Sequence, residues 1–407
     1  SGIIVMGALA YSQRWAAFFK KYDHWRYFFA EWNKLLYLKS YRRHHHSGAI
    51  EKSLHHAVRW LIHSISTGSD RGSGTYYHNS GWTSSYPETT GYIVPTLLRY
   101  AQNEEGPWAK NAVSAALEAG KWLLETQHTD GGWPGGYVHQ KRDSVVFNTG
   151  QILRGMRALY LFTGEEVYKE SAHRAIVWVW NQLDTEGKFS SNDFMGAVRV
   201  YGTYVVAPIL EWSQHFEADK DAWEAKARLH LDWVLTQQQD NFWLANCDNT
   251  EHKNHKPIIH TIAYTLDGLF DAGSLLQDEK YKNAAIGGAE MLAQKFLERG
   301  LLHGRYDKRW HGSEAFIPTG GAQLSILWHK IARADTKAYW AEEARGSMNV
   351  LLSVIATSGA RTAPDVGGAL QGSFPMWGRY ESFGLPNWAT KYMVDSLMNE
   401  LNWSNEH

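Results

Sequence analysis

The chain has 407 residues, with 41 lysines and arginines against 42 aspartates and glutamates, which gives a formal net charge of −1. This balance excludes the strong positive field needed to bind along a nucleic-acid backbone. The single cysteine, Cys247, excludes an internal disulfide and any metal site built from several cysteines. No apolar run approaches the ~20 residues of a transmembrane helix. We therefore expect a protein without nucleic acid, transmembrane segment, metal or cofactor. Its compartment is open, with the cytoplasm slightly favoured over the periplasm.

The composition is unusual in its 20 tryptophans and 21 tyrosines. These side chains combine a large apolar face with a polar group. Most should pack between helices. A minority is expected to line a groove for flat ligands rich in hydroxyl groups, such as sugars.

Residues 1–49 stand apart from the rest of the chain. They contain AAFFKKYDHWRYFFAEWNKLLYLKSYRRHHH, which predicts an amphipathic helix with a basic end. Three interpretations are open: a strap that packs on the main domain, a contact in a homo-oligomer, or attachment to a membrane surface.

From residue 51 onward a helical pattern recurs about every 58 residues. Each copy has a polar face, and most begin with Trp or Tyr and carry Ala one turn later. The copies are residues 51–66, 108–127, 168–183, 223–238, 281–296 and 339–354. A helix that is apolar on one face only is expected to lie on the outside of the molecule.

A second series lies between these segments. It comprises residues 88–102, 147–164, 200–216, 260–276, 318–332 and 385–401. These segments carry few charges on any face, which indicates burial on several sides. Six outer and six inner helices therefore alternate. We predict an all-α (α/α)6 toroid over residues 50–407, with residues 1–49 as an N-terminal helical extension.

The connections also alternate in length. Short ones lead from an inner to an outer helix, as at residues 164–166, and long ones lead from an outer to an inner helix, as at 67–87 and 241–259. All long connections should meet at one rim, around the N-termini of the inner helices. Long loops on a rigid scaffold commonly carry function. We therefore place the site at this rim.

The rim segments supply aromatic, amide and ionisable side chains. In chain order, the expected substrate-binding residues are Tyr76, Trp82, Tyr86, Tyr92, Trp133, Tyr137, Asn148, Gln151, Tyr204, Trp310, His311, Gln323, Trp377, Tyr380, Asn387 and Trp388. The expected catalytic residues are Glu88, Arg199, Tyr201, His260, Tyr264, Glu314 and Glu381. Ion pairing is an alternative role for the charged residues of the last two connections.

Two chemistries fit these residues. Proton abstraction next to a carboxylate of the substrate needs that carboxylate to be neutralised, for which Arg199, Asn148 and Gln151 are candidates. It also needs a base and an acid, for which His260, Tyr264 and Tyr201 are candidates. Glycoside hydrolysis instead needs two carboxyl groups, which Glu88, Glu314 and Glu381 could supply. The sequence gives no distances across the ring, so it does not choose between them.

Four segments carry a resemblance: SYPETTGYIVPTLL, FNTGQILRGMRALY, IHTIAYTLDGLFDAG and LPNWATKYMVDSLM. They resemble bacterial toroid proteins of exopolysaccharide gene clusters, often labelled prenyltransferase-like or terpene-cyclase-like. The chain lacks the acidic motif of squalene–hopene cyclases and the two-cysteine zinc set of lanthionine cyclases. The toroid is closer in kind to six-hairpin glycosidases, toroidal polysaccharide lyases and glucuronyl epimerases.

The resemblance implies a carbohydrate-active enzyme with an acidic exopolysaccharide, or its precursor, as the substrate. Lyase or epimerase chemistry at a uronic acid is the first hypothesis and glycoside hydrolysis the second. The third hypothesis is a non-catalytic glycan-binding or scaffold protein of polysaccharide assembly, and the fourth is a toroid that binds an isoprenoid.

Overall fold

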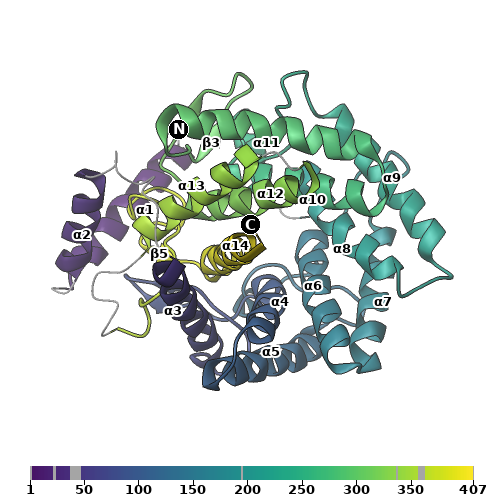
Figure 1. Cartoon of the computed structure of the whole chain (residues 1–407), viewed down its shortest axis with the longest axis horizontal. Helices are drawn as coiled ribbons and strands as arrows, with labels where there is room; N and C mark the ends of the chain where they lie inside the picture. The colour runs from purple at the N-terminus through teal and green to yellow at the C-terminus, as the bar shows by residue number, and fades with distance from the viewer. Residues whose placement is uncertain are drawn as a thin grey trace.

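The computed structural model describes residues 2–21, 24–36, 47–193, 196–335, 338–355 and 363–406. Within these residues, two concentric rings of helices alternate along the chain (Figure 1). The outer helices are α3 (Ser47–Ser66), α5 (Pro107–Thr126), α7 (Glu166–Asn181), α9 (Lys220–Thr236), α11 (Glu279–Arg299) and α13 (Ala338–Val354). The inner helices are α4 (Pro87–Asn103), α6 (Val146–Thr163), α8 (Thr203–Ser213), α10 (Ile259–Leu275), α12 (Pro318–Asp335) and α14 (Asn387–Glu406).

The inner ring is closed. Each inner helix packs against the next, and α14 contacts α12 on one side and α3 and α4 on the other. The predicted (α/α)6 toroid is confirmed, including the assignment of every helix to its ring. Burial follows the sequence pattern, since α10 is buried over most of its length whereas α11 buries one face only.

Glycine allows the close contact between α4 and α6. A Cβ at Gly155 would lie 2.3 Å from the carbonyl oxygen of Gly91, and a Cβ at Gly91 would lie 2.6 Å from the Cα of Ile152. Both separations are far below van der Waals contact, so the two helices can approach this closely only with glycine at both positions.

The long connections all lead into the N-terminal ends of the inner helices, as predicted. The strands that these connections contain are very short. Strands β1 (Tyr76–Tyr77), β2 (Gly81–Trp82) and β5 (Gly384–Leu385) form an antiparallel sheet in the order β2-β1-β5, which ties the first connection to the last. Strands β3 (Arg305–Tyr306) and β4 (Gly312–Ser313) form a hairpin. The connections also hold the 3-10 helices η2 (Val138–Gln140), η4 (Val200–Gly202) and η5 (Glu251–Lys253).

The N-terminal extension forms two helices instead of one, α1 (Gly2–Phe19) and α2 (His24–Leu36), which lie beside the ring (Figure 1). Phe18 stacks on Phe383 of the last connection. Glu31 is 1% exposed and accepts hydrogen bonds from the backbone N–H of Met376 and the side chain of Gln371. These are the contacts of a strap on the long-loop rim.

The opposite face of α2 is not covered by any of the described residues. Its exposed side chains are Trp25, Phe29, Trp32 and Leu36. Within the described residues, no helix combines the length and the apolar character needed to cross a bilayer. Contact of this face with a membrane surface or a second copy stays a prediction, and the basic end of the extension, residues 37–46, lies outside the described residues.

Candidate functional site

A cavity of about 270 Å³ opens at the rim where the long connections meet. Its walls come from the N-terminal turns of α4, α6, α10 and α14 and from the long connections, chiefly the second and the last. The structure brings eleven of the predicted site residues to this cavity: Tyr86, Glu88, Tyr92, Tyr137, Asn148, Tyr201, His260, Tyr264, Tyr380, Glu381 and Trp388. We call it the mouth cavity.

A layer of four tyrosines forms its floor. Tyr92 and Tyr264 line the mouth cavity, whereas Tyr204 and Tyr392 line a separate cavity at the other end of the ring. The hydroxyl groups of Tyr204 and Tyr392 are 3.1 Å apart, and the rings of Tyr204 and Tyr264 have centroids 4.7 Å apart. The central hollow is therefore divided, and the mouth cavity is a blind pocket.

Glu88 is the most strongly perturbed carboxyl group of the cavity. It lies in the first turn of α4, a position that favours an ionised carboxylate. Burial opposes this preference and raises the pKa of Glu88 to about 7, although the neighbouring Tyr86 hydroxyl lowers it in part. Near neutral pH this side chain can therefore both donate and accept a proton.

Glu381 is the second carboxyl group of the cavity, and it comes from the connection that precedes α14. Burial also raises its pKa, and the hydroxyl of Tyr77 donates a hydrogen bond to it, which favours the ionised form. The cavity thus holds two buried carboxyl groups, each beside a tyrosine hydroxyl, Tyr86 for Glu88 and Tyr77 for Glu381.

His260 and Tyr264 lie side by side in the first two turns of α10, with ring centroids 5.7 Å apart. The Nδ1 atom of His260 has no hydrogen-bond partner among the described residues, and burial lowers the pKa of His260 to about 3, so the ring is neutral. Burial raises the pKa of Tyr264 well above its ordinary value. The histidine is a weak base, and the tyrosine is a weak acid.

Polar groups without partners also face the mouth cavity. Asn148 is 1% exposed and lies close to the Tyr86 hydroxyl, but within the described part of the chain neither its side-chain nitrogen nor its oxygen meets the geometry of a hydrogen bond. Among the described residues that line the cavity, Arg142 carries the one permanent positive charge, and none of the contacts seen in the structure pairs it with a carboxylate. Sequence reasoning passed over Arg142 because it stands in the charged run KRD, which is typical of a solvated loop.

The other two predicted catalytic residues lie outside the mouth cavity. The guanidinium of Arg199 is buried and donates to the backbone carbonyls of Val198 and Asn249 at 3.3 and 3.4 Å. Glu314 follows strand β4 and contacts Arg305 at 3.3 Å and Lys253 at 3.5 Å. Glu314 therefore has the alternative role considered for the charged residues of its connection, that of a partner in ion pairs.

The remaining predicted binding residues do not line the mouth cavity, and most of them have structural partners elsewhere. Trp133 and Trp310 are buried and donate to backbone carbonyls, and Gln151 donates to the backbone carbonyl of Tyr204. Tyr76 and Trp82 pack on each other, and Trp377 packs on Trp15 of the strap. His311 contacts Asp307, Asn387 donates to Ser73 and Thr89, and Tyr204 and Gln323 line the cavity at the opposite end.

No protein-family model matches the sequence, and no curated protein matches it by sequence. Solved structures, however, match it over most of its length. An unsaturated glucuronyl hydrolase specific for heparin matches with a TM-score of 0.69 and 15% identity, covering 88% of this chain and 99% of that chain. The chain shares the fold of these toroid enzymes.

Two further structures support this likeness. An unsaturated glucuronyl hydrolase from Bacillus sp. GL1 matches with a TM-score of 0.68 and 10% identity, covering 86% of this chain and 96% of that chain. Cellobiose 2-epimerase from Spirochaeta thermophila matches with a TM-score of 0.65 and 10% identity, covering 88% of this chain and 97% of that chain. At these sequence identities the comparisons establish the toroid fold only. The chemistry has to be argued from the residues of the site.

Proposed function

We propose that this protein is a carbohydrate-active enzyme that hydrolyses a glycosidic bond at the end of an acidic glycan chain. The observation that carries the proposal is Glu88, a buried carboxyl group with a pKa of about 7 in a cavity that it shares with Glu381. Glycoside hydrolysis uses one carboxyl group that is protonated and one that is ionised. The comparisons support a glycan substrate, because the structural neighbours include glucuronyl hydrolases.

Glu88 takes the part of the proton donor to the leaving oxygen. Glu381 takes the part of the ionised partner, because the positive charge of Arg14 favours its charged form in addition to the hydrogen bond from Tyr77. Tyr86, Tyr137, Tyr380 and Trp388 supply aromatic surface against which a sugar ring can pack.

The shape of the cavity supports action at a chain end. The tyrosine floor closes one end, and a volume of about 270 Å³ lies just below the ~300–1,000 Å³ of typical ligand pockets. Arg142 is placed to bind the carboxylate of a terminal uronic acid. We extend the proposal to an acidic exopolysaccharide, or its precursor, as the source of the chain.

The test is product analysis on oligosaccharides with a saturated or an unsaturated uronic acid at the non-reducing end. A hydrolase releases the terminal sugar and creates one new reducing end for each bond that is broken. New ultraviolet absorbance from an unsaturated uronate would instead identify a lyase. Glycan binding without any product would identify a binding or scaffold protein and would contradict the proposal.

A second candidate is epimerisation at a uronic acid, favoured by the neutral His260 with its free Nδ1 atom in the same cavity. The low pKa of His260 makes it a weak base for removing a proton from carbon. Deuterium uptake into the sugar from heavy water, without chain cleavage, would select this chemistry over hydrolysis.

The pH profile should report the ionisation of Glu88. Its proton is held up to a pH of about 7, so we expect kcat/KM to fall on the alkaline side as pH rises through 7. The folded protein binds this proton more tightly than the unfolded chain does. The contribution of Glu88 to stability therefore also falls as pH rises from 4.5 through 7. Rates measured across this range check the prediction, and a profile that stays flat up to pH 9 would contradict it.

Replacing Arg142 should weaken binding of the substrate. In Arg142→Met we expect KM to rise about tenfold with little change in kcat, because a charge-assisted hydrogen bond to the ligand is lost in ground state and transition state alike. Lys141→Met is the matched control, since Lys141 is exposed next to it and does not line the cavity. Equal KM values in the two variants would remove Arg142 from the site.

A further inference from the structure

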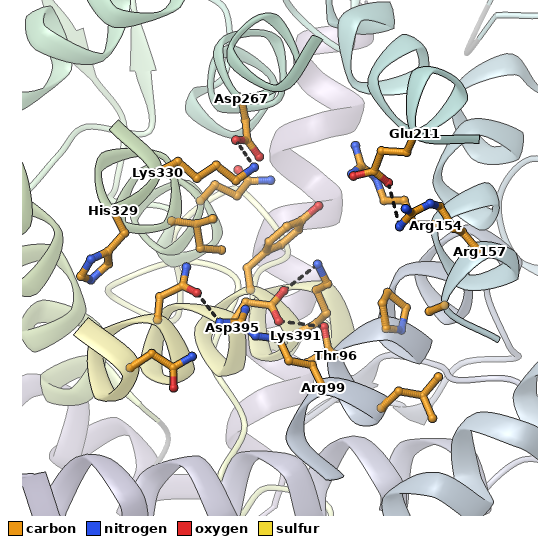
Figure 2. Close-up of a pocket in the computed structure, with 18 of the residues that line it drawn as sticks. Thr96, Arg99, Arg154, Arg157, Glu211, Asp267, His329, Lys330, Lys391 and Asp395 are labelled. Carbon is orange, nitrogen blue, oxygen red and sulfur yellow. Dashed lines mark hydrogen bonds and ion pairs between the residues drawn. The ribbon is translucent and has the colours of Figure 1, made fainter. Parts of the chain in front are cut away.

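A second cavity of about 740 Å³ opens at the opposite end of the ring, between the C-terminal halves of the inner helices (Figure 2). The layer of four tyrosines separates it from the mouth cavity. We call it the basal cavity. Its size lies within the range of sites for small organic ligands, and the proposed hydrolysis makes no use of it.

Positive charge is in excess in the basal cavity. Its lining carries six cationic side chains, Arg99, Arg154, Arg157, Lys330, Arg333 and Lys391, against three carboxylates, Glu211, Asp267 and Asp395. Lys330 is neutralised by Asp267 and Asp271, each at 2.7 Å, and Lys391 by Asp395 at 2.8 Å. Counting Asp271, three aspartates lie on the two lysines, so any positive charge that is left over lies on arginines.

Arg99 and Arg154 contact no carboxylate within the described part of the chain. Arg99 donates to the side-chain oxygen of Asn399 at 2.5 Å. Arg154 donates to the side chain of Gln151 and to the backbone carbonyl of Tyr204 at 3.0 and 2.9 Å, and it lies over the ring of Tyr204. None of these contacts neutralises a guanidinium group, so Arg99 and Arg154 each place a full positive charge at the cavity wall.

Arg157 is only loosely paired. Its closest approach to Glu211 is 3.9 Å, and its buried Nε atom has no hydrogen-bond partner in the part of the chain that the structure describes. Arg154 and Arg157 extend from α6 on the side of the cavity opposite Lys330 of α12 (Figure 2). A ligand between these walls can reach guanidinium groups on one side and an ammonium group on the other.

A second observation points to a ligand with polar groups. Gln323 on α12 lines the basal cavity and is 4% exposed, yet among the described residues neither its amide nitrogen nor its amide oxygen has a hydrogen-bond partner. Buried amides without partners are rare in folded proteins. A hydroxyl group of a bound sugar would satisfy both atoms, as donor to one and acceptor from the other.

Helix dipoles alone do not explain the arginines. Cations at helix C-termini offset the partial negative charge there, but the effect is confined to the last turn. Arg154 and Arg157 lie well before the end of α6 at Thr163. Their charge is therefore available to something other than the helix end.

We propose that the basal cavity is a second ligand site, built for a phosphorylated sugar. A phosphate monoester carries up to two negative charges and matches the fork geometry of guanidinium groups. Arg99, Arg154 and Arg157 bind its phosphate, and Gln323 binds a sugar hydroxyl. A phosphate offers three acceptor oxygens to these three guanidinium groups, whereas a single uronate carboxylate offers two, which favours phosphate over carboxylate.

The test is isothermal titration calorimetry with glucose 1-phosphate, inorganic phosphate, glucuronate and glucose as probes. We expect saturable binding of glucose 1-phosphate, weaker binding of phosphate and glucuronate, and none of glucose. Arg99→Gln and Arg157→Gln should each weaken binding of glucose 1-phosphate about tenfold, since each loses a charge-assisted contact. Arg309→Gln is the control, because Arg309 is exposed at the other end of the ring.

Three results would overturn the proposal. The first is no saturable binding of either phosphate probe. The second is equal affinity in wild type and in both cavity variants, each shown to be folded by its thermal transition. The third is loss of glucose 1-phosphate binding in Glu88→Gln, which would place the ligand in the mouth cavity. The basal site is independent of the proposed hydrolysis, so either can fail without the other. Equal affinity for inorganic phosphate and glucose 1-phosphate would remove the sugar from the proposal.

Discussion

Glu88→Gln should reduce kcat for hydrolysis of a uronate-capped oligosaccharide by about 10²–10⁴-fold, the usual contribution of general acid–base catalysis. Glutamine keeps the size of the side chain and its hydrogen-bonding capacity but cannot transfer the proton. KM should change little, because the polar contacts to the substrate survive. Initial rates of reducing-end release measure both quantities.

The same variant tests whether the loss is chemical or structural. The glutamate is ionised at high pH at a cost to folding, because burial raises its pKa to about 7. Glu88→Gln should therefore be at least as stable as wild type at pH 8 to 9 in urea denaturation. Glu314→Gln is the matched comparison: a predicted catalytic carboxylate that the structure places outside the cavity, and it should keep most of its activity. If Glu314→Gln lost activity and Glu88→Gln kept it, the assignment would be reversed.

Arg305→Met should lower the free energy of unfolding by about 3–5 kcal/mol, the loss typical of breaking a buried ion pair from one side. Arg305 is 6% exposed and its Nη1 atom lies 2.7 Å from Asp248, which is fully buried. Asp248 also accepts hydrogen bonds from the backbone N–H groups of Thr250 and Ile258. Methionine would leave this carboxylate buried without its counter-ion.

The pH dependence gives this prediction a sharper form. Burial by itself would raise the pKa of Asp248, but Arg305 and the hydrogen bonds to the carboxylate together bring it below its ordinary value. The pair therefore stabilises the fold above the ordinary pKa of aspartate, 3.8, and this stabilisation is lost as pH falls through the lowered pKa. The difference between Arg305→Met and wild type in urea denaturation should shrink in acid. Arg309→Met, an exposed arginine in the same hairpin, should change stability by less than about 0.5 kcal/mol, and an equal loss in both variants would contradict the buried-pair explanation.

The ring of helices could be predicted because the pattern of each segment alone indicates whether that segment is an inner or an outer helix. The outer segments have one apolar face and the inner ones have almost no charged face, so each segment shows its layer without reference to any other. The alternation of short and long connections then places all long loops on one rim. Glu88 and His260 could be chosen for the same reason, since each stands in the first turn of an inner helix.

The residues that line the mouth cavity could not be predicted fully. How deeply a side chain is buried, and which residue it contacts, cannot be read from the local sequence pattern. Trp133 looks like a rim aromatic among glycines, yet its indole N–H donates to Leu123 in the core. Gln151 lies one helical turn beyond Asn148. At this position it does not reach the mouth cavity and instead accepts a hydrogen bond from Arg154. Arg199 and Arg142 both stand before inner helices, and only the folded loops show which of the two reaches the cavity.

The division of the ring by tyrosines could not be predicted from one segment either. Tyr92, Tyr204, Tyr264 and Tyr392 each belong to a different inner helix, and they meet only because the ring closes. Their meeting decides the character of the site. An open channel would suit a chain that passes through, whereas a blind pocket suits a chain that ends there.

The most direct test of the account is a crystal structure of the Glu88→Gln variant with a uronate-capped oligosaccharide bound. We expect the terminal sugar in the mouth cavity, its glycosidic oxygen within hydrogen-bond reach of the side chain at position 88 and its carboxylate against Arg142. An oligosaccharide found on the outside of the ring, or in the mouth cavity with its glycosidic bond turned away from both Glu88 and Glu381, would contradict the account.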